Sequence, residues 1–81
     1  MKAENLANNQ IVINEGNKST FNSYGVNVAQ KVNGQITLDS KYWDYSQTTT
    51  KYLSRFLGEA SKKFIEKGIK EGVYLLDNLN K

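Results

Sequence analysis

The side chains best able to bind or react gather between residues 39 and 70 of this 81-residue chain. Three aromatic residues, Tyr42, Trp43 and Tyr45, alternate there with two carboxylates, Asp39 and Asp44. Aromatic side chains combine a large contact area with few rotatable bonds, so Tyr42 and Tyr45 are candidate partner-binding residues. A single indole covers so much area that we expect Trp43 in the core.

A basic segment follows the aromatic residues. Its cations are Lys51, Arg55, Lys62, Lys63, Lys67 and Lys70, and the only acids between them are Glu59 and Glu66. Clustered cations attract phosphate groups, so these six side chains are candidate contacts to a partner, nucleic acid included. Lysines opposite an apolar stripe are equally what a solvated amphipathic helix presents, and both interpretations stay open.

The composition removes most catalytic machinery. The chain has no cysteine and no histidine, which excludes thiol nucleophiles, imidazole bases and nearly all zinc, copper and haem ligation. Asp39 and Asp44 lack the spacing of an acid–base pair or of a calcium loop, and we expect Asp44 to accept backbone amides in a turn. Phosphate-binding glycine loops and GxSxG motifs are absent from the sequence. We therefore expect no enzymatic activity, no metal and no other cofactor.

Length and charge narrow the class further. A chain of 81 residues suits one domain with a thin core, and its net charge of +3 permits nucleic acid as a partner without requiring it. The start, Met1 to Asn5, lacks an apolar signal segment, and no stretch approaches the roughly 20 apolar residues of a membrane span. We expect a cytoplasmic protein of the host cell with no membrane partner. Residues 1–10 are expected to be weakly ordered or a short helix, and residues 11–81 to form one domain.

Strands are expected in the N-terminal half. Residues 11–13 form a short β-branched run, and from residue 20 to residue 32 the apolar side chains fall on even positions, the period of a half-buried strand. The pair Asn33-Gly34 marks a hairpin whose second arm covers residues 35–40.

The register of this hairpin is predicted from its apolar residues. A two-residue loop of Asn33-Gly34 would place Val28 opposite Asp39 and put the apolar side chains of the two strands on opposite faces. A three-residue loop that includes Val32 pairs Val28 with Leu38 and Gln30 with Ile36, so we predict that loop. The residues then expected to face the helices are Tyr24, Val26, Val28, Ile36 and Leu38. Those expected to face solvent or a partner subunit are Asn27, Thr37 and Asp39.

Two helices and a last strand are predicted after residue 45. Hydroxyls at residues 46–50 can cap a helix that ends at Gly58, and a second helix opens near Ser61 and stops at Gly72. The side chains expected to point inward from them are Leu53, Phe56, Leu57, Phe64 and Ile65. Residues 73–76 are then a buried strand. The order β-β-β-α-α-β predicts an α+β fold, with both helices on one face of a small antiparallel sheet and a homodimer through an open sheet edge.

Residues 38–58, LDSKYWDYSQTTTKYLSRFLG, resemble a family of short proteins of unknown function encoded by phages and prophages of low-GC Gram-positive bacteria. The similarity is specific in the run Trp43-Asp44-Tyr45, in the hydroxyl cluster of residues 46–50 and in the helix of residues 51–58. A lysine-rich helix, a glycine and a short strand ending in Asp-Asn-Leu-Asn extend it. The family has no assigned activity, so the resemblance implies a phage accessory protein rather than a particular chemistry.

The expected function is therefore binding. The first hypothesis is a non-catalytic phage-type accessory protein that binds and modulates a host or defence protein, for example as an anti-CRISPR-like inhibitor. The alternative is a small DNA-binding regulator that uses residues 48–72 in a helix-turn-helix-like arrangement. Glutamine and asparagine, the usual base readers, are missing from the second helix, and lysines alone contact phosphate rather than sequence.

Overall fold

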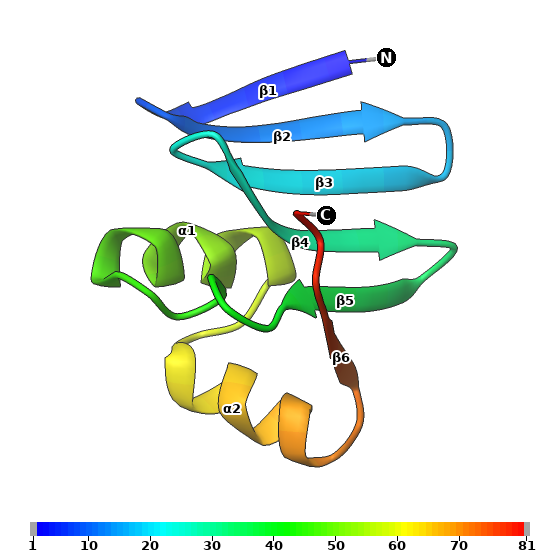
Figure 1. Ribbon diagram of the computed structural model, residues 1–81, viewed down its shortest axis with the longest axis vertical. Helices are drawn as coiled ribbons and strands as arrows, with labels where there is room; N and C mark the ends of the chain where they lie inside the picture. Colours follow the sequence, from blue (N-terminus) through cyan, green and yellow to red (C-terminus); the bar gives the residue numbers. More distant parts are fainter. Residues whose placement is uncertain (1, 81) are drawn as a thin grey trace.

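The computed structural model describes residues 2–80 as one mixed sheet with two helices (Figure 1). The elements in chain order are β1 (Lys2–Ala7), β2 (Gln10–Glu15), β3 (Lys18–Ser23), β4 (Val26–Val32), β5 (Gln35–Asp39), α1 (Gln47–Leu57), α2 (Lys62–Lys70) and β6 (Tyr74–Asp77). The strands lie in sequence order across the sheet, and only the last pair, β5 and β6, is parallel. The predicted α+β class is confirmed.

The predicted strand order and the all-antiparallel sheet are wrong. Five strands precede the helices rather than three, because residues 2–7 form β1 and because the stretch of residues 20–32 is divided by a turn. That turn is Tyr24-Gly25, where both residues have positive φ, 53° and 81°, so Tyr24 is exposed at a hairpin tip and not in the core. The two helices carry the chain back to the start of β5, and β6 therefore runs parallel to it.

The predicted register of the β4–β5 hairpin is also wrong. Val32 pairs with Gln35 and Ala29 with Leu38, so the loop is the two-residue Asn33-Gly34, with φ of 52° and 84°. Positive φ at both positions is the type I′ geometry that matches the twist of the strands.

A β-bulge explains why the apolar pattern predicted the wrong loop. Phe21 pairs with Ala29 while Asn22 pairs with Asn27, which leaves Val28 as an extra residue in β4. The bulge shifts the alternation by one residue, and both Val28 and Ala29 are fully buried. Beyond it the odd positions of β4 share the helix-facing side with the even positions of β5.

Both helices cover the same face of the sheet, as predicted. Lys31, Ile36 and Tyr74 are aligned across β4, β5 and β6, so their side chains share a face. Lys31 contacts Phe56 of α1, and Tyr74 lies against Gly68 of α2. The buried hydrophobic core between the sheet and the helices comprises Val12, Phe21, Val28, Ala29, Leu38, Leu53, Ile65 and Tyr74.

The ends of α1 agree with the predicted capping. Ser46 is the N-cap, and its Oγ accepts the backbone N–H of Thr49 at 3.1 Å. Gly58 closes the helix in the left-handed conformation with φ of 76°, as predicted. The N-cap of α2 is Ser61, close to the predicted start.

The inward face of α2 is narrower than predicted. Ile65 and Gly68 are buried and Ile69 packs against the core, whereas Phe64, which was expected to point inward, is 51% exposed. The strand predicted at residues 73–76 exists, but Tyr74 is its only buried side chain. Helix α2 and strand β6 therefore pack closely through Gly68 and Tyr74, and the apolar side chains of Phe64, Leu75 and Leu76 stay exposed.

Candidate functional site

Asp39 organises the loop that carries the aromatic candidates. Its carboxylate was expected to face solvent, yet the residue is only 1% exposed. Oδ2 accepts the backbone N–H groups of Lys41 and Tyr42 at 3.1 and 2.9 Å. Oδ1 accepts the backbone N–H of Leu79 at 2.8 Å and Nδ2 of Asn80 at 3.1 Å. Asp39, rather than Asp44, thus has the predicted role of accepting turn amides, and it joins the loop to the C-terminal segment.

The C-terminal segment is held against the start of β4. Asn80 Oδ1 accepts the backbone N–H of Asn27, and Asn80 Nδ2 donates to the carbonyl of Asn27, both at 2.9 Å. The amide thereby imitates the backbone of a neighbouring strand. In Figure 1 the chain runs from β6 back toward β4 to make these contacts.

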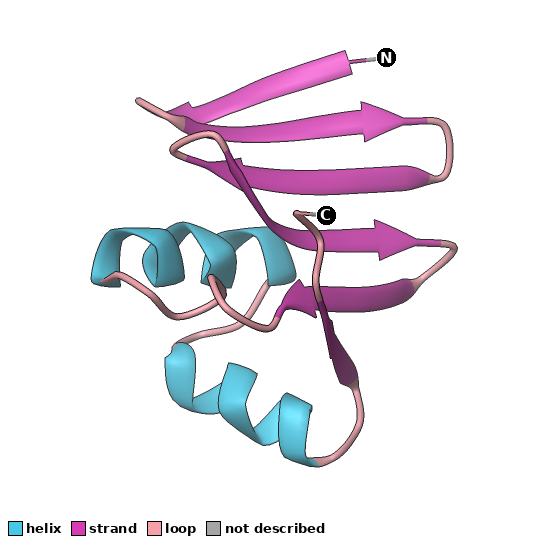
Figure 2. Ribbon diagram, viewed as in Figure 1, coloured by secondary structure: helices cyan, strands magenta, loops and turns pink. Residues whose placement is uncertain are grey.

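The loop of residues 40–46 contains no helix or strand and presents the aromatic candidates (Figure 2). The rings of Tyr42 and Tyr45 meet edge to face, with centroids 5.4 Å apart and an interplanar angle of 86°. Tyr45 is exposed and Tyr42 is partly buried. Trp43 is partly buried and packs against the core, with Lys62 Nζ 5.7 Å from its ring centroid.

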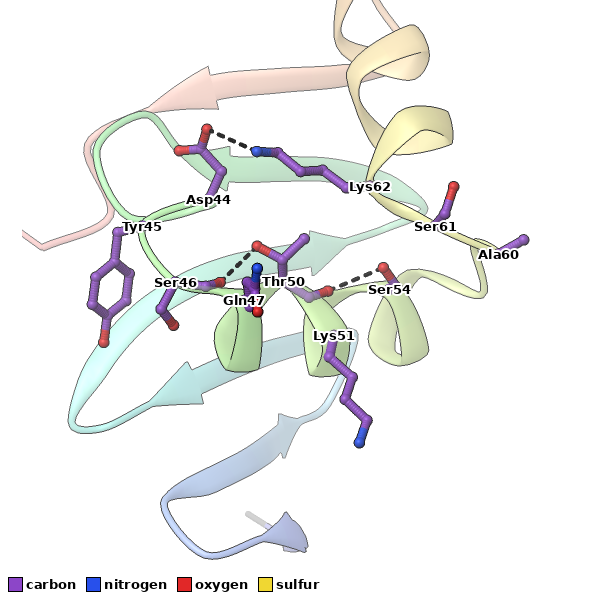
Figure 3. Close-up of a pocket in the computed structure, with 10 residues that line it drawn as sticks. All are labelled: Asp44, Tyr45, Ser46, Gln47, Thr50, Lys51, Ser54, Ala60, Ser61 and Lys62. Atoms are coloured by element: carbon purple, nitrogen blue, oxygen red, sulfur yellow. Dashed lines mark hydrogen bonds and ion pairs between the residues drawn. The ribbon is translucent and has the colours of Figure 1, made fainter.

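An open groove of about 520 Å³ lies between this loop, α1 and the start of α2 (Figure 3). It is lined by Asp44, Tyr45, Ser46, Gln47, Thr50, Lys51, Ser54, Ala60, Ser61 and Lys62. Asp44 Oδ2 lies 3.7 Å from Lys62 Nζ, while Tyr45 and Lys51 point away from that pair in Figure 3.

The hydroxyl groups of this groove are used locally. Thr50 Oγ1 donates to the carbonyl of Ser46 at 2.9 Å, and Ser54 Oγ donates to the carbonyl of Thr50 at 3.0 Å. A hydroxyl nucleophile needs a base within hydrogen-bond reach to take its proton. Among residues 2–80, no lining hydroxyl is hydrogen-bonded to a carboxylate, so the groove does not assemble such a pair.

A second group of candidates lies on α1. Lys51 Nζ and the Arg55 guanidinium approach the ring of Tyr52, at 5.5 and 5.2 Å from its centroid. Lys31 Nζ lies 4.6 Å from the ring centroid of Phe56 and donates to the Phe56 carbonyl at 2.7 Å, which satisfies an acceptor at the end of the helix. Cations and aromatic rings therefore alternate along this side of α1.

A groove of about 300 Å³ adjoins these cations on the uncovered part of the helix-facing side of β1 and β2. It is lined by Glu4, Leu6, Val12, Asn14, Ser19, Lys31, Arg55 and Phe56. The groove exists because α1 reaches β2 and β3 and leaves the side chains of β1 open. The sequence offered no signal for it, since its walls come from five separate elements.

The third group follows the outer side of α2. Lys63, Lys67 and Lys70 line a hollow of about 540 Å³ with Phe64 and Glu66. Lys62, on another side of the helix, lies 3.9 Å from Glu66 and faces Asp44. The first groove thus brings Tyr45, Lys51 and Lys62 together, and Tyr42 lies beside Tyr45. The other predicted site residues lie elsewhere: Arg55 lines the groove beside β1 and β2, and Lys63, Lys67 and Lys70 line the hollow on α2.

Two features escaped the sequence interpretation. Gln10 is only 1% exposed, and neither polar atom of its side chain has a hydrogen-bond partner among residues 2–80. The pKa of Tyr74 is raised above its ordinary 10.0, mainly because the ring is buried and also because the Glu59 carboxylate lies nearby. Neither feature could be predicted from the sequence, because glutamine is mostly an exposed residue and tyrosine occurs at both exposed and buried positions.

Comparison with known proteins places the chain in a family. Within residues 2–80, no helix is long and apolar enough to cross a membrane, and no cluster of three or more acidic side chains is arranged to hold a metal ion. The comparisons found no similar curated protein and no similar solved structure. A family of unknown function, DUF8033, matches residues 1–72, which run from β1 through α2 and so include the N-terminal hairpins. The chain therefore belongs to the DUF8033 family.

Proposed function

We propose that this protein is a non-catalytic phage-type accessory protein that binds and modulates a host or defence protein, for example as an anti-CRISPR-like inhibitor. The phage provenance rests on the resemblance of residues 38–58. The observation that carries the binding function is the exposure of three apolar side chains on and beside β6: Val73 is 55% exposed, Leu75 48% and Leu76 45%. Large exposed apolar side chains that lie near one another are typical of protein-binding surfaces.

The backbone of β6 supports the same proposal. It is the last strand of the sheet, so its outer edge has no neighbouring strand within residues 2–80. The opposite edge, β1, carries Glu4 and an irregularity at Leu6, two devices that discourage strand pairing. β6 has no bulge, and its one charged residue is Asp77 at its end. An extended segment of the partner would therefore add to β6 and cover Leu75 and Leu76, by main-chain hydrogen bonds and apolar contact.

The test is affinity capture from a nuclease-treated lysate of a Gram-positive host. The wild type should retain one protein in stoichiometric amount. The variant Leu75→Thr/Leu76→Thr should lose it, because threonine keeps the strand propensity but removes the apolar contact. Val32→Thr, on β4, is the matched control and should retain the partner. Recovery of nucleic acid alone, or equal capture by the β6 variant, would contradict the proposal.

A small DNA-binding regulator is the second candidate, supported by Lys63, Lys67 and Lys70, which make no ion pair within residues 2–80. Neutralising phosphates releases counterions, so duplex binding by α2 would weaken steeply as salt rises. Replacing Lys62, Lys63 and Lys67 with glutamate should abolish a gel shift of duplex DNA. Unchanged binding, or no shift by the wild type at low salt, would eliminate this candidate.

A further inference from the structure

Cations and partly buried aromatic rings lie beside one another along α1, whose own sequence contains no acid. We call the surface formed by Lys31, Lys51, Tyr52, Arg55 and Phe56 the cation–aromatic face. We propose that this face, with the groove beside it, binds single-stranded nucleic acid. The proposal is independent of the partner surface at β6, because the two share no residue.

Within residues 2–80, the cations of this face have no carboxylate partner, and Nζ of Lys31 donates to the Phe56 carbonyl. The sequence of α1, QTTTKYLSRFL, contains no aspartate or glutamate. Within residues 2–80, none of Lys31, Lys51 and Arg55 forms an ion pair with a carboxylate. Lys62 differs, since it faces both Asp44 and Glu66. Three unpaired cations on one surface are complementary to a chain of phosphates.

The aromatic rings add a contact that a bare lysine surface lacks. The Arg55 guanidinium lies against Tyr52, and Lys31 lies against Phe56. A guanidinium plane supported by a ring is itself a platform on which a base can stack, and unpaired bases bind proteins largely in this way. The bases of a duplex are paired and stacked on one another, so this contact selects single strands.

The neighbouring groove has the size and chemistry for one nucleotide. Its volume of about 300 Å³ is at the small end of ligand pockets. The apolar side chains of Leu6, Val12 and Phe56 line it and can contact a base, and Lys31 and Arg55 also line it and can contact a phosphate. Glu4, the one carboxylate of the described lining, can accept a hydrogen bond from a base amino group.

A nucleic acid suits this face better than a protein partner does. Two of its three charged residues, Lys51 and Arg55, are exposed, and the third, Lys31, is partly buried. The rings of Tyr52 and Phe56 are partly covered. Protein interfaces centre on exposed apolar or aromatic anchors with few charges. Here the charges surround partly covered rings, which is the arrangement of strand-binding grooves.

Fluorescence anisotropy with a labelled mixed-sequence DNA single strand of about 12 nucleotides tests the proposal, with the matching duplex as the comparison. The wild type should bind the single strand more tightly than the duplex. With three phosphates neutralised, its affinity should fall about 20-fold between about 50 and 200 mM salt. The double variant Lys51→Gln/Arg55→Gln should bind at least about 10-fold more weakly. The matched control Lys18→Gln/Lys41→Gln removes the same charge from β3 and from the loop after β5, and it should bind nearly as the wild type does.

Two further variants separate stacking from charge. Tyr52→Leu keeps every cation and should weaken the single strand at least about 5-fold, and Arg55→Lys keeps the charge but removes the planar group and should also weaken it. Thermal unfolding of each variant checks that the fold is intact. Absence of binding by the wild type at about 50 mM salt, tighter binding of the duplex, or equal weakening by the Lys18→Gln/Lys41→Gln control would overturn the proposal.

Discussion

Gly68 lies in the middle of α2, where alanine would ordinarily be the more stable residue. Alanine favours a helix interior over glycine by about 1 kcal/mol. In this structure a Cβ at position 68 would lie 2.6 Å from both Cδ2 and Cε2 of Tyr74. Carbon atoms pack at roughly 3.5–4.0 Å, so one of the two groups must move.

The ring of Tyr74 has little freedom to move. The residue is only 6% exposed, and the backbone N–H of the preceding Val73 donates to the carbonyl of Gly68 at 2.8 Å. Strand and helix are thereby held together at the point of the clash. Overpacking of this kind costs about 1–3 kcal/mol. The cost exceeds the gain in helix propensity, and we expect Gly68→Ala to destabilise the fold by about 1–2 kcal/mol.

Thermal and urea unfolding measure this directly. A loss of about 1–2 kcal/mol corresponds to a fall in Tm of roughly 5–15 °C for a domain of this size. The control places the same change in a Tyr74→Val background, where the ring is gone and only helix propensity remains. There Gly68→Ala should stabilise by up to about 1 kcal/mol. The effect of the substitution should therefore change sign between the two backgrounds, a coupling of about 2–3 kcal/mol.

A rise in Tm on Gly68→Ala in the wild-type background would contradict the predicted destabilisation. It would mean that Tyr74 does not pack on the backbone of α2. The close contact between α2 and β6 would then have to depend on residues other than Gly68 and Tyr74.

Three further predictions concern the fold. Asp39→Asn should lower the free energy of unfolding by at least about 3 kcal/mol in urea titrations, because an amide cannot accept all four N–H groups that the carboxylate accepts. A loss below about 1 kcal/mol would contradict this prediction. Because the folded-state pKa of Tyr74 is raised above 10.0, its contribution to stability is complete below pH 10 and is lost as pH rises from there through the folded-state pKa. Tyr74→Phe should accordingly lose less stability than the wild type between about pH 9 and pH 11, and parallel losses would disprove it. If the β6 edge pairs with a second copy, sedimentation should show a dimer that Leu75→Thr/Leu76→Thr converts to a monomer; equal masses would contradict this.

The sequence predicted the helical half well because its signals are local. The Ser46 cap, the Gly58 terminus and the Ser61 start each depend on residues within one turn of the chain. The Asn33-Gly34 pair was also recognised as a hairpin turn. The predicted length of this loop is wrong because a turn at Tyr24-Gly25 and a bulge at Val28 interrupt the alternation of residues 20–32.

The candidate site could be predicted only as a set of residue types. The candidate aromatic and basic side chains follow β5 in the chain, but their division among the loop, α1 and α2 follows from the direction in which each helix packs. Asp39 could not be distinguished from Asp44 because its C-terminal partners are about 40 residues away. Residues 73–76 were predicted to be a buried strand, because a short apolar run has the same sequence pattern whether it is buried or exposed.

The α+β class, the capped helices and the position of the Asn33-Gly34 turn therefore follow from the sequence alone, because these depend on periodicity and on neighbours along the chain. The bulge at Val28, the parallel pairing of β6 and the burial of Asp39 and Tyr74 depend on the tertiary structure. Each of these results from contacts between segments far apart in the sequence. Their free energy depends on how the helices pack against the sheet, which a local pattern does not contain.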